Sequence, residues 1–180
     1  MQADLDGAVR IVNAAGAFNW TWADGDLKRF CDQVGWAVIH SGPDGASIET
    51  DLEVSVPKAH AFFSHNVIRV LADAGETIEW IVAWVTDIAD DEDSDEQDAR
   101  LIEPDAYLIR AFEQLRDLIG SELGVPLGEE VDEDLRHEIT WETGTVVIKL
   151  ALSTQVVSVS LVNPRYHEWA NDGADDDHDE

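Results

Sequence analysis

The sequence predicts an α+β fold in which helices cover one face of an antiparallel β-meander. The first observation is period-two alternation of apolar and polar residues in three consecutive runs within residues 137–163. Turn-forming residues at 142–144 and 153–154 separate these runs. The second observation is a long apolar stripe at helical spacing over residues 104–123. Because a sheet with one apolar face needs a cover, we expect this helix to pack on the meander.

Length and composition indicate one domain over residues 1–170, since the chain has 180 residues and is 44% hydrophobic. The single cysteine, Cys31, cannot form an internal disulfide, which favours a reducing compartment. Asp4, Asp6 and Arg10 interrupt the apolar core that a signal peptide would need. No apolar run approaches the roughly 20 residues of a membrane helix. We therefore expect a cytoplasmic protein that does not bind a membrane.

Two helices are expected at the N-terminus. The first covers residues 3–15, and Gly16 is placed as its C-terminal cap. The second begins at Asp24 as N-cap and ends at Gly35, a residue suited to a left-handed cap. Cys31 lies in the apolar stripe of this second helix, so we expect a small buried side chain rather than a nucleophile.

A hairpin and further strands should follow. Residues 36–40 and 47–50 flank a Gly-Pro-Asp-Gly turn, which is a strong hairpin signal. Alternation over residues 52–56 predicts another strand. Residues 59–74 fit either a helix stripe or a strand, and their β-branched residues favour a strand over 67–72.

Residues 77–86 predict a central strand, because both of its faces are apolar. Ile78, Trp80, Val82 and Trp84 alternate with a second apolar set, so we expect a cover on both sides. After the meander, one helical turn is expected within residues 165–171, followed by an acidic disordered tail over 171–180.

Charge is the most unusual feature of the composition. The net charge is −28, from 39 acidic and 11 basic side chains. Residues 87–98 hold eight acids and no base, residues 129–134 hold five acids, and residues 171–180 hold six. Such a surface repels nucleic acid and anionic lipid and attracts basic partners. Solubility or adaptation to high salt would also explain it.

No pattern in the sequence predicts a catalytic residue, a metal site or a cofactor. A calcium-loop frame that starts at Asp91 fails at Glu96, where glycine is needed, and at Ile102, where glutamate is needed. The six histidines show no zinc-ligand spacing. The Gly-x-Ser-x-Gly, phosphate-loop and dinucleotide motifs are missing.

Two tryptophans are candidates for partner contact. Trp20 and Trp22 lie between the two N-terminal helices, where exposed rings could act as anchors at a protein interface. Four others fall on apolar faces and are expected in the core: Trp36, Trp80, Trp84 and Trp141. The acids expected beside the partner are Asp87, Asp90, Asp91, Glu92, Asp93, Asp95, Glu96 and Asp98.

Several segments together resemble a family of small, uncharacterised acidic proteins from actinobacteria. They are the Phe-Asn-Trp-Thr-Trp segment 18–22, the helix 24–36, the strand end 84–87 and the closing segment 159–166. These proteins are similar in character to immunity proteins of polymorphic toxin systems. The Leu-Pro and Tyr-bearing opening motif of the best-known immunity superfamily is not found here. The resemblance spans residues 5–166 and implies no catalytic residues.

The sequence therefore favours a non-catalytic monomer that forms a heterodimer with a basic protein, such as a cognate toxin domain. Occlusion would inhibit the toxin, and the charge of residues 87–98 would chiefly raise the association rate. Two alternatives stay open. One is an acidic interaction protein that mimics the charge of nucleic acid, and the other is an enzyme with an acidic pocket.

Overall fold

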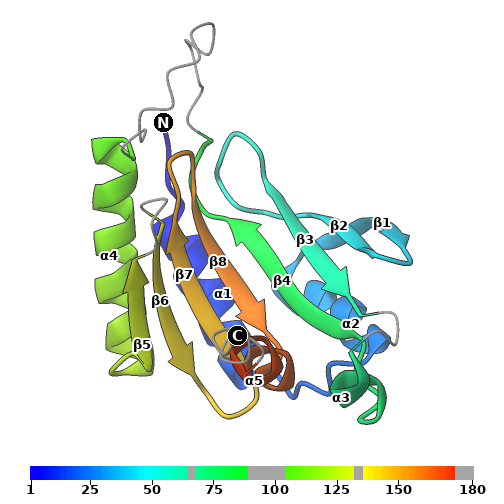
Figure 1. Cartoon of the computed structure of the whole chain (residues 1–180). Coiled ribbons are helices and arrows are strands. Elements are labelled where there is room, and N and C mark those ends of the chain that lie inside the picture. The colour runs from blue at the N-terminus through cyan, green and yellow to red at the C-terminus, as the bar shows by residue number, and fades with distance from the viewer. Residues whose placement is uncertain (65–67, 89–103, 132–135, 173–180) are drawn as a thin grey trace, which may run out of the picture.

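The fold is known from a computed structural model that describes residues 1–64, 68–88, 104–131 and 136–172 (Figure 1). The helices are α1 (Leu5–Ala17), α2 (Asp24–Val34), α3 (Arg69–Ala72), α4 (Ala106–Leu123) and α5 (Pro164–Asp172). The strands are β1 (Ala37–Gly42), β2 (Gly45–Glu49), β3 (Lys58–Phe63), β4 (Ile78–Trp84), β5 (Gly128–Val131), β6 (His137–Glu142), β7 (Val147–Leu152) and β8 (Val157–Val162). These strands form one antiparallel sheet in the order β1-β2-β3-β4-β8-β7-β6-β5.

The predicted α+β class and the C-terminal meander are confirmed. β6, β7 and β8 pair as consecutive antiparallel strands, and β8 then pairs with β4. The N-terminal hairpin is also present, as β1 and β2 joined at Pro43 and Asp44. The pairing of β4 with β8 therefore joins the N-terminal and C-terminal strands into one sheet.

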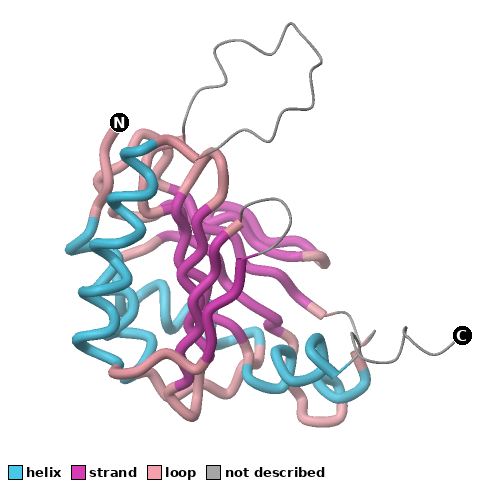
Figure 2. Tube along the Cα trace, turned by 60° about the vertical axis from the view of Figure 1, so that its left-hand side comes forward, coloured by secondary structure: helices cyan, strands magenta, loops and turns pink. Residues whose placement is uncertain are grey.

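One face of the sheet carries the core. A continuous row of paired residues crosses six strands on this face, and none is more than 2% exposed: Ile48, Ala59, Ala83, Val159, Leu150 and Ile139. The helices α1, α2 and α4 lie on this side of the strands (Figure 2). As predicted, the long helix α4 packs on the meander, against β7 and β8, through a buried stripe: Leu108, Ala111, Phe112, Leu115 and Ile119.

Within the described residues, little packs on the other face of the sheet, which corrects the expectation for β4. This strand is central, but Trp80, Val82 and Trp84 are only half-buried. Ile78 does not share their face, because a bulge opposite Phe62 and Phe63 shifts the register and leaves Ile78 fully buried. Figure 1 places α5 in front of one end of this face. We call this side of the sheet the open face.

The strand predicted over residues 52–56 is wrong. The chain is irregular there because two carboxylates take amides that a strand would use for pairing. The Glu53 amide donates to Asp4 (3.0 Å), and the Ser55 amide donates to Asp87 (2.7 Å). Leu52 is nevertheless buried, so the segment still contributes to the core.

The strand favoured over residues 67–72 is also wrong where the structure describes it, over residues 68–72; residue 67 lies outside the described residues. Residues 58–63 are strand, but 69–72 form the short helix α3, which begins after Ile68 and precedes Gly75 at φ +72°. The Glu76 amide donates to the Leu71 carbonyl (2.9 Å), closing the turn. Local hydrogen bonds outweigh the β-branched propensity at this position.

Several element boundaries differ from prediction, and three helices illustrate the differences. α1 continues through Gly16 and ends at Ala17, because the Phe18 amide can still donate to Ala15. α2 has Ala23 as N-cap, so Asp24 is its first residue, whereas Gly35 has the predicted left-handed conformation at φ +82°. α5 extends to residue 172 and includes the first two residues of the predicted tail. Residues 173–180 lie outside the described residues.

The edge strand β5 was not predicted. Its Glu129 and Glu130 were counted as part of an acidic segment, yet they pair with β6 at Ile139 and Glu138. Charged, exposed side chains are common on edge strands because they discourage further pairing. In the part of the chain that the structure describes, no helix has the length and apolarity needed to cross a membrane.

Candidate functional site

The predicted acidic site is represented in the described residues by Asp87 alone. Its carboxylate accepts hydrogen bonds from the amides of Gln2 (2.6 Å) and Ser55 (2.7 Å), and the N-terminal amine lies 3.9 Å away. Burial opposes the charge, but these amide donors outweigh burial and lower the pKa of Asp87. Asp87 thus fastens the N-terminus and the 51–57 loop together. The other seven predicted acids lie outside the described residues: Asp90, Asp91, Glu92, Asp93, Asp95, Glu96 and Asp98.

Trp20 and Trp22 belong to the core, and this corrects their assignment as partner-contacting residues. They are 7% and 4% exposed, and their rings stack at 4.5 Å between centroids. The Trp20 indole donates to the Ala15 carbonyl (2.9 Å), and the Trp22 indole donates to the Thr145 carbonyl (3.0 Å). Neither ring presents a surface to a partner.

A row of four aromatic rings lies on the open face instead. Phe62 from β3 stacks on Trp80 from β4, with centroids 4.4 Å apart and planes at 21°. Trp80 contacts Tyr166 of α5 at 5.1 Å, and Tyr166 contacts Trp169 at 5.8 Å. The ends of the row are the most accessible, since Phe62 is 37% exposed and Trp169 is 48% exposed. We call these four residues the aromatic row.

Three cations on or beside the open face have acidic neighbours. Lys149 lies 2.7 Å from Glu138, and Arg165 lies 3.3 Å from Glu76. Lys58 is directly opposite Glu49 in the pairing of β2 with β3. Further acids border the same face, among them Asp44 in the β1–β2 turn, Glu79 at the bulge of β4 and Glu142 at the end of β6. The open face therefore combines accessible rings with an excess of negative charge.

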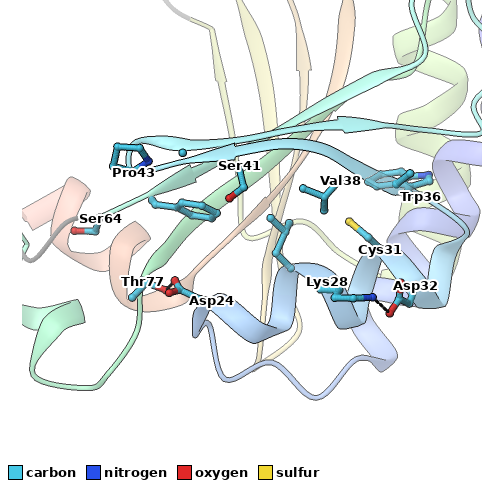
Figure 3. A pocket seen from close by; sticks show the side chains of 14 residues that line it. Asp24, Lys28, Cys31, Asp32, Trp36, Val38, Ser41, Pro43, Ser64 and Thr77 are labelled. Atoms are coloured by element: carbon cyan, nitrogen blue, oxygen red, sulfur yellow. Dashed lines mark hydrogen bonds and ion pairs between the residues drawn. The ribbon is translucent and has the colours of Figure 1, made fainter.

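A groove of about 910 Å³ runs between α2 and the β1–β2 hairpin (Figure 3). Apolar parts of Leu27, Cys31, Trp36, Val38 and Phe63 line it. It follows β1, an edge strand whose first five residues are all exposed.

The charged groups of the groove are mostly engaged with neighbours. Lys28 lies 2.7 Å from Asp32, and the Thr77 hydroxyl donates to Asp24 at one end (Figure 3). The groove therefore carries less net charge than the open face, and a basic partner is better matched by the open face.

Cys31 is buried, as the sequence predicted. It is 2% exposed, and burial, with a smaller contribution from Asp32, raises the pKa of its thiol to about 11. The thiol is therefore protonated at neutral pH.

Three of the described histidines have close side-chain neighbours. His137 lies 2.6 Å from Glu129, His60 contacts the Trp84 ring at 5.8 Å, and His167 lies 3.3 Å from Asn171. The described part of the chain contains no group of three side chains suited to hold a metal ion.

Comparison with known proteins places nearly the whole fold within one sequence family. A profile described as a family of unknown function, DUF6301, matches residues 6–163, which extend from α1 to the end of β8. No curated protein and no solved structure matches the chain.

Proposed function

The chain belongs to DUF6301, a family of unknown function, and we propose that it is a non-catalytic binding protein that occludes a basic protein partner. The open face carries this proposal, because it joins accessible aromatic rings to an acidic surround. Tryptophan and tyrosine are enriched among the residues that dominate binding energy at interfaces. Carboxylates around such rings favour cationic partners and raise the rate of encounter.

We further propose that the partner is a toxin domain and that this protein acts as its immunity protein. The resemblance of segments 18–22, 24–36, 84–87 and 159–166 to immunity-like acidic proteins supports this choice. A rigid sheet face is suited to cover an active site, since binding then requires little ordering of the chain. The net charge of −28 would speed association with a cationic toxin.

The proposal is tested by capture and rescue. The tagged chain is incubated with lysate of its source cell at low salt, washed, and eluted at high salt. Each captured protein is then expressed in a bacterial host with and without this chain. We expect a basic protein that stops growth when expressed alone and permits growth when both are present. A partner that is harmless alone, or that DNA displaces, would instead favour a protein that mimics nucleic acid.

The open face is tested with matched surface variants. One variant carries Phe62→Ser and Trp169→Ser on the open face. The control carries Ile109→Ser and Leu118→Ser on α4, whose side chains are comparably exposed at 39% and 40%. We expect the open-face variant to bind the partner at least about tenfold more weakly, because each anchor ring contributes on the order of 1–2 kcal/mol. Equal affinities for the two variants would place the interface elsewhere.

The predicted role of the acidic run is tested by charge-matched neutralisation. One variant changes five acids of the run to amides: Asp91, Glu92, Asp93, Asp95 and Glu96. The control changes five acids of the tail: Asp175, Asp176, Asp177, Asp179 and Glu180. If the run steers the partner, only the first variant lowers the association rate and flattens its salt dependence. Equal effects from both variants would mean that overall charge, rather than the run, is responsible.

A further inference from the structure

We propose that two copies of this chain associate by antiparallel pairing of their β1 strands, which forms a dimer with one continuous sheet. β1 and β5 are the two edges of the sheet, and within the described residues β1 pairs only with β2. Alternate residues of an edge strand direct their N–H and C=O groups away from the sheet, where a further strand can bind them. The proposal goes beyond the binding function proposed above and does not depend on it.

The two edges of the sheet differ in the charge that discourages pairing. β5 has Glu129 and Glu130 among its four residues, so a second copy at this edge would bring like charges together. Residues 37–42 of β1 contain no acid, lysine or arginine. Two of them are exposed aliphatic side chains, Val38 at 38% and Ile39 at 56%. β1 is therefore the edge at which like charges on the strand do not oppose a second copy.

The groove beside β1 adds an apolar surface that the pairing would bury. It runs between α2 and the β1–β2 hairpin, and Figure 3 shows Val38 and Ser41 directed from β1 toward α2. Leu27 and Trp36 also line the groove. A second β1 strand would lie about 4.8 Å from the first, with its own Val38 on the same face of the sheet. The second Val38 would therefore extend the apolar wall of the groove and lose its exposure to solvent.

A second copy fits this edge better than a basic partner does. It supplies an extended, uncharged strand, and two-fold symmetry lets each strand offer the same groups to the other. The Lys28 ammonium beside the groove already lies 2.7 Å from Asp32, so this rim offers little charge to attract a basic protein. The backbone of β1 and its aliphatic side chains are therefore what an occupant would recognise.

The dimer should be weak, because the paired strands are short. β1 has six residues, and its register with β2 shifts at a bulge between Val38 and His40. A bulge bends a strand and interrupts regular pairing. We expect a dissociation constant on the order of 10–100 µM, since such an interface is smaller than that of a permanent dimer.

Salt should strengthen this dimer. Each copy carries a net charge of −28, so the two copies repel one another until salt screens their charges. Binding of a basic partner should respond in the opposite way, because salt weakens attraction between opposite charges. Edge pairing about an axis perpendicular to the sheet also leaves both open faces accessible on the same side of the dimer.

Sedimentation equilibrium of the full chain, over a series of protein concentrations at low and high salt, tests the proposal. Ile39→Glu places an acid on the β1 edge, and Val131→Glu is the matched control on the β5 edge. The two wild-type side chains are 56% and 64% exposed, and both variants add one negative charge. We expect Ile39→Glu to weaken the dimer at least about tenfold and the control to stay within about twofold of the wild type.

Amide hydrogen exchange locates the pairing. At high salt and at a protein concentration above the dissociation constant, amides of residues 38–42 should exchange more slowly than in dilute protein, while those of β5 should not change. A chain that stays monomeric up to about 1 mM, a dimer unaffected by Ile39→Glu, or protection at β5 instead of β1 would overturn the proposal.

These outcomes are separate from failure of the proposed function. A monomer that captures a basic toxin would refute only the pairing of β1. A β1-paired dimer for which no basic partner is found would refute only the function.

Discussion

Replacing Asp26 should destabilise the protein more than any other single change to a charged side chain of α2. Asp26 is only 1% exposed, although it is ionisable. Its carboxylate accepts hydrogen bonds from the Trp22 amide (2.8 Å), the Thr21 amide and the Thr21 hydroxyl (3.0 Å). Arg29 also lies 2.6 Å from it. This carboxylate therefore holds the segment that leads into α2, including Trp22 in its left-handed conformation at φ 58°.

The expected loss of unfolding free energy follows from the two backbone amides that Asp26→Ala would leave without an acceptor. A hydrogen bond to a charged group contributes about 1.5–3 kcal/mol, so two give on the order of 3–6 kcal/mol. The Arg29 side chain is 54% exposed, and its ion pair adds little because solvent screens it. Asp26→Asn keeps one oxygen acceptor and should cost roughly half as much.

Urea unfolding followed by tryptophan fluorescence measures the effect, provided that the slope with denaturant is unchanged. Asp32→Ala is the matched control on the same helix, because its side chain is 63% exposed and pairs only with Lys28. We expect the control to stay within about 0.5 kcal/mol of the wild type. A loss below about 1 kcal/mol for Asp26→Ala would show that water or a relaxed backbone satisfies both amides, and the reasoning would fail.

Three further predictions concern single residues. Phe112→Ala should lower the free energy of unfolding by about 3–5 kcal/mol in the same urea assay, because Phe112 is 2% exposed between α4 and the sheet. Iodoacetamide should modify Cys31 slowly at pH 8 unless urea is added, since burial raises the pKa of its thiol to about 11; fast labelling of the folded protein would contradict this. The amide donors lower the pKa of Asp87 despite its burial. The ionised Asp87 carboxylate therefore stabilises the fold above its unfolded pKa of about 3.9. This stabilisation is lost as the pH falls through the pKa of Asp87 in the folded protein. Asp87→Asn should therefore be less stable than the wild type at neutral pH, measured by thermal melts, and the two should converge in acid.

The regular parts of the fold could be predicted from local patterns. Period-two alternation predicted which residues of β6, β7 and β8 face the core, and the apolar stripe of α4 predicted its buried side. The failed strand over residues 52–56 lies where distant side chains decide the structure. Asp4 and Asp87 hold the 51–57 loop by its amides, and both are far from it in sequence. No periodicity within residues 52–56 could reveal these bonds.

The aromatic row could not be predicted because it depends on which face of β4 the helices cover. Trp80 and Trp84 alternate with Ile81 and Ala83, and both sets are apolar enough for a core. Burial of the Ile81 side under the helices leaves the tryptophan side open. Phe62 joins the row only through the register of β3 with β4. The clustering of Tyr166 and Trp169 close after the last predicted strand was the one available signal.

The net charge of this protein is a poor guide to the charge that a partner would meet, because several acids bind groups within the fold. Asp26 and Asp87, counted as negative surface in the sequence, each accept two backbone amides and serve the fold. Asp51 likewise binds Arg10 through two hydrogen bonds of 2.6 and 2.8 Å and accepts the Trp36 indole. A cationic partner would respond only to carboxylates that are not used in this way. The salt dependence of binding should therefore correspond to far fewer charges than the net charge of −28.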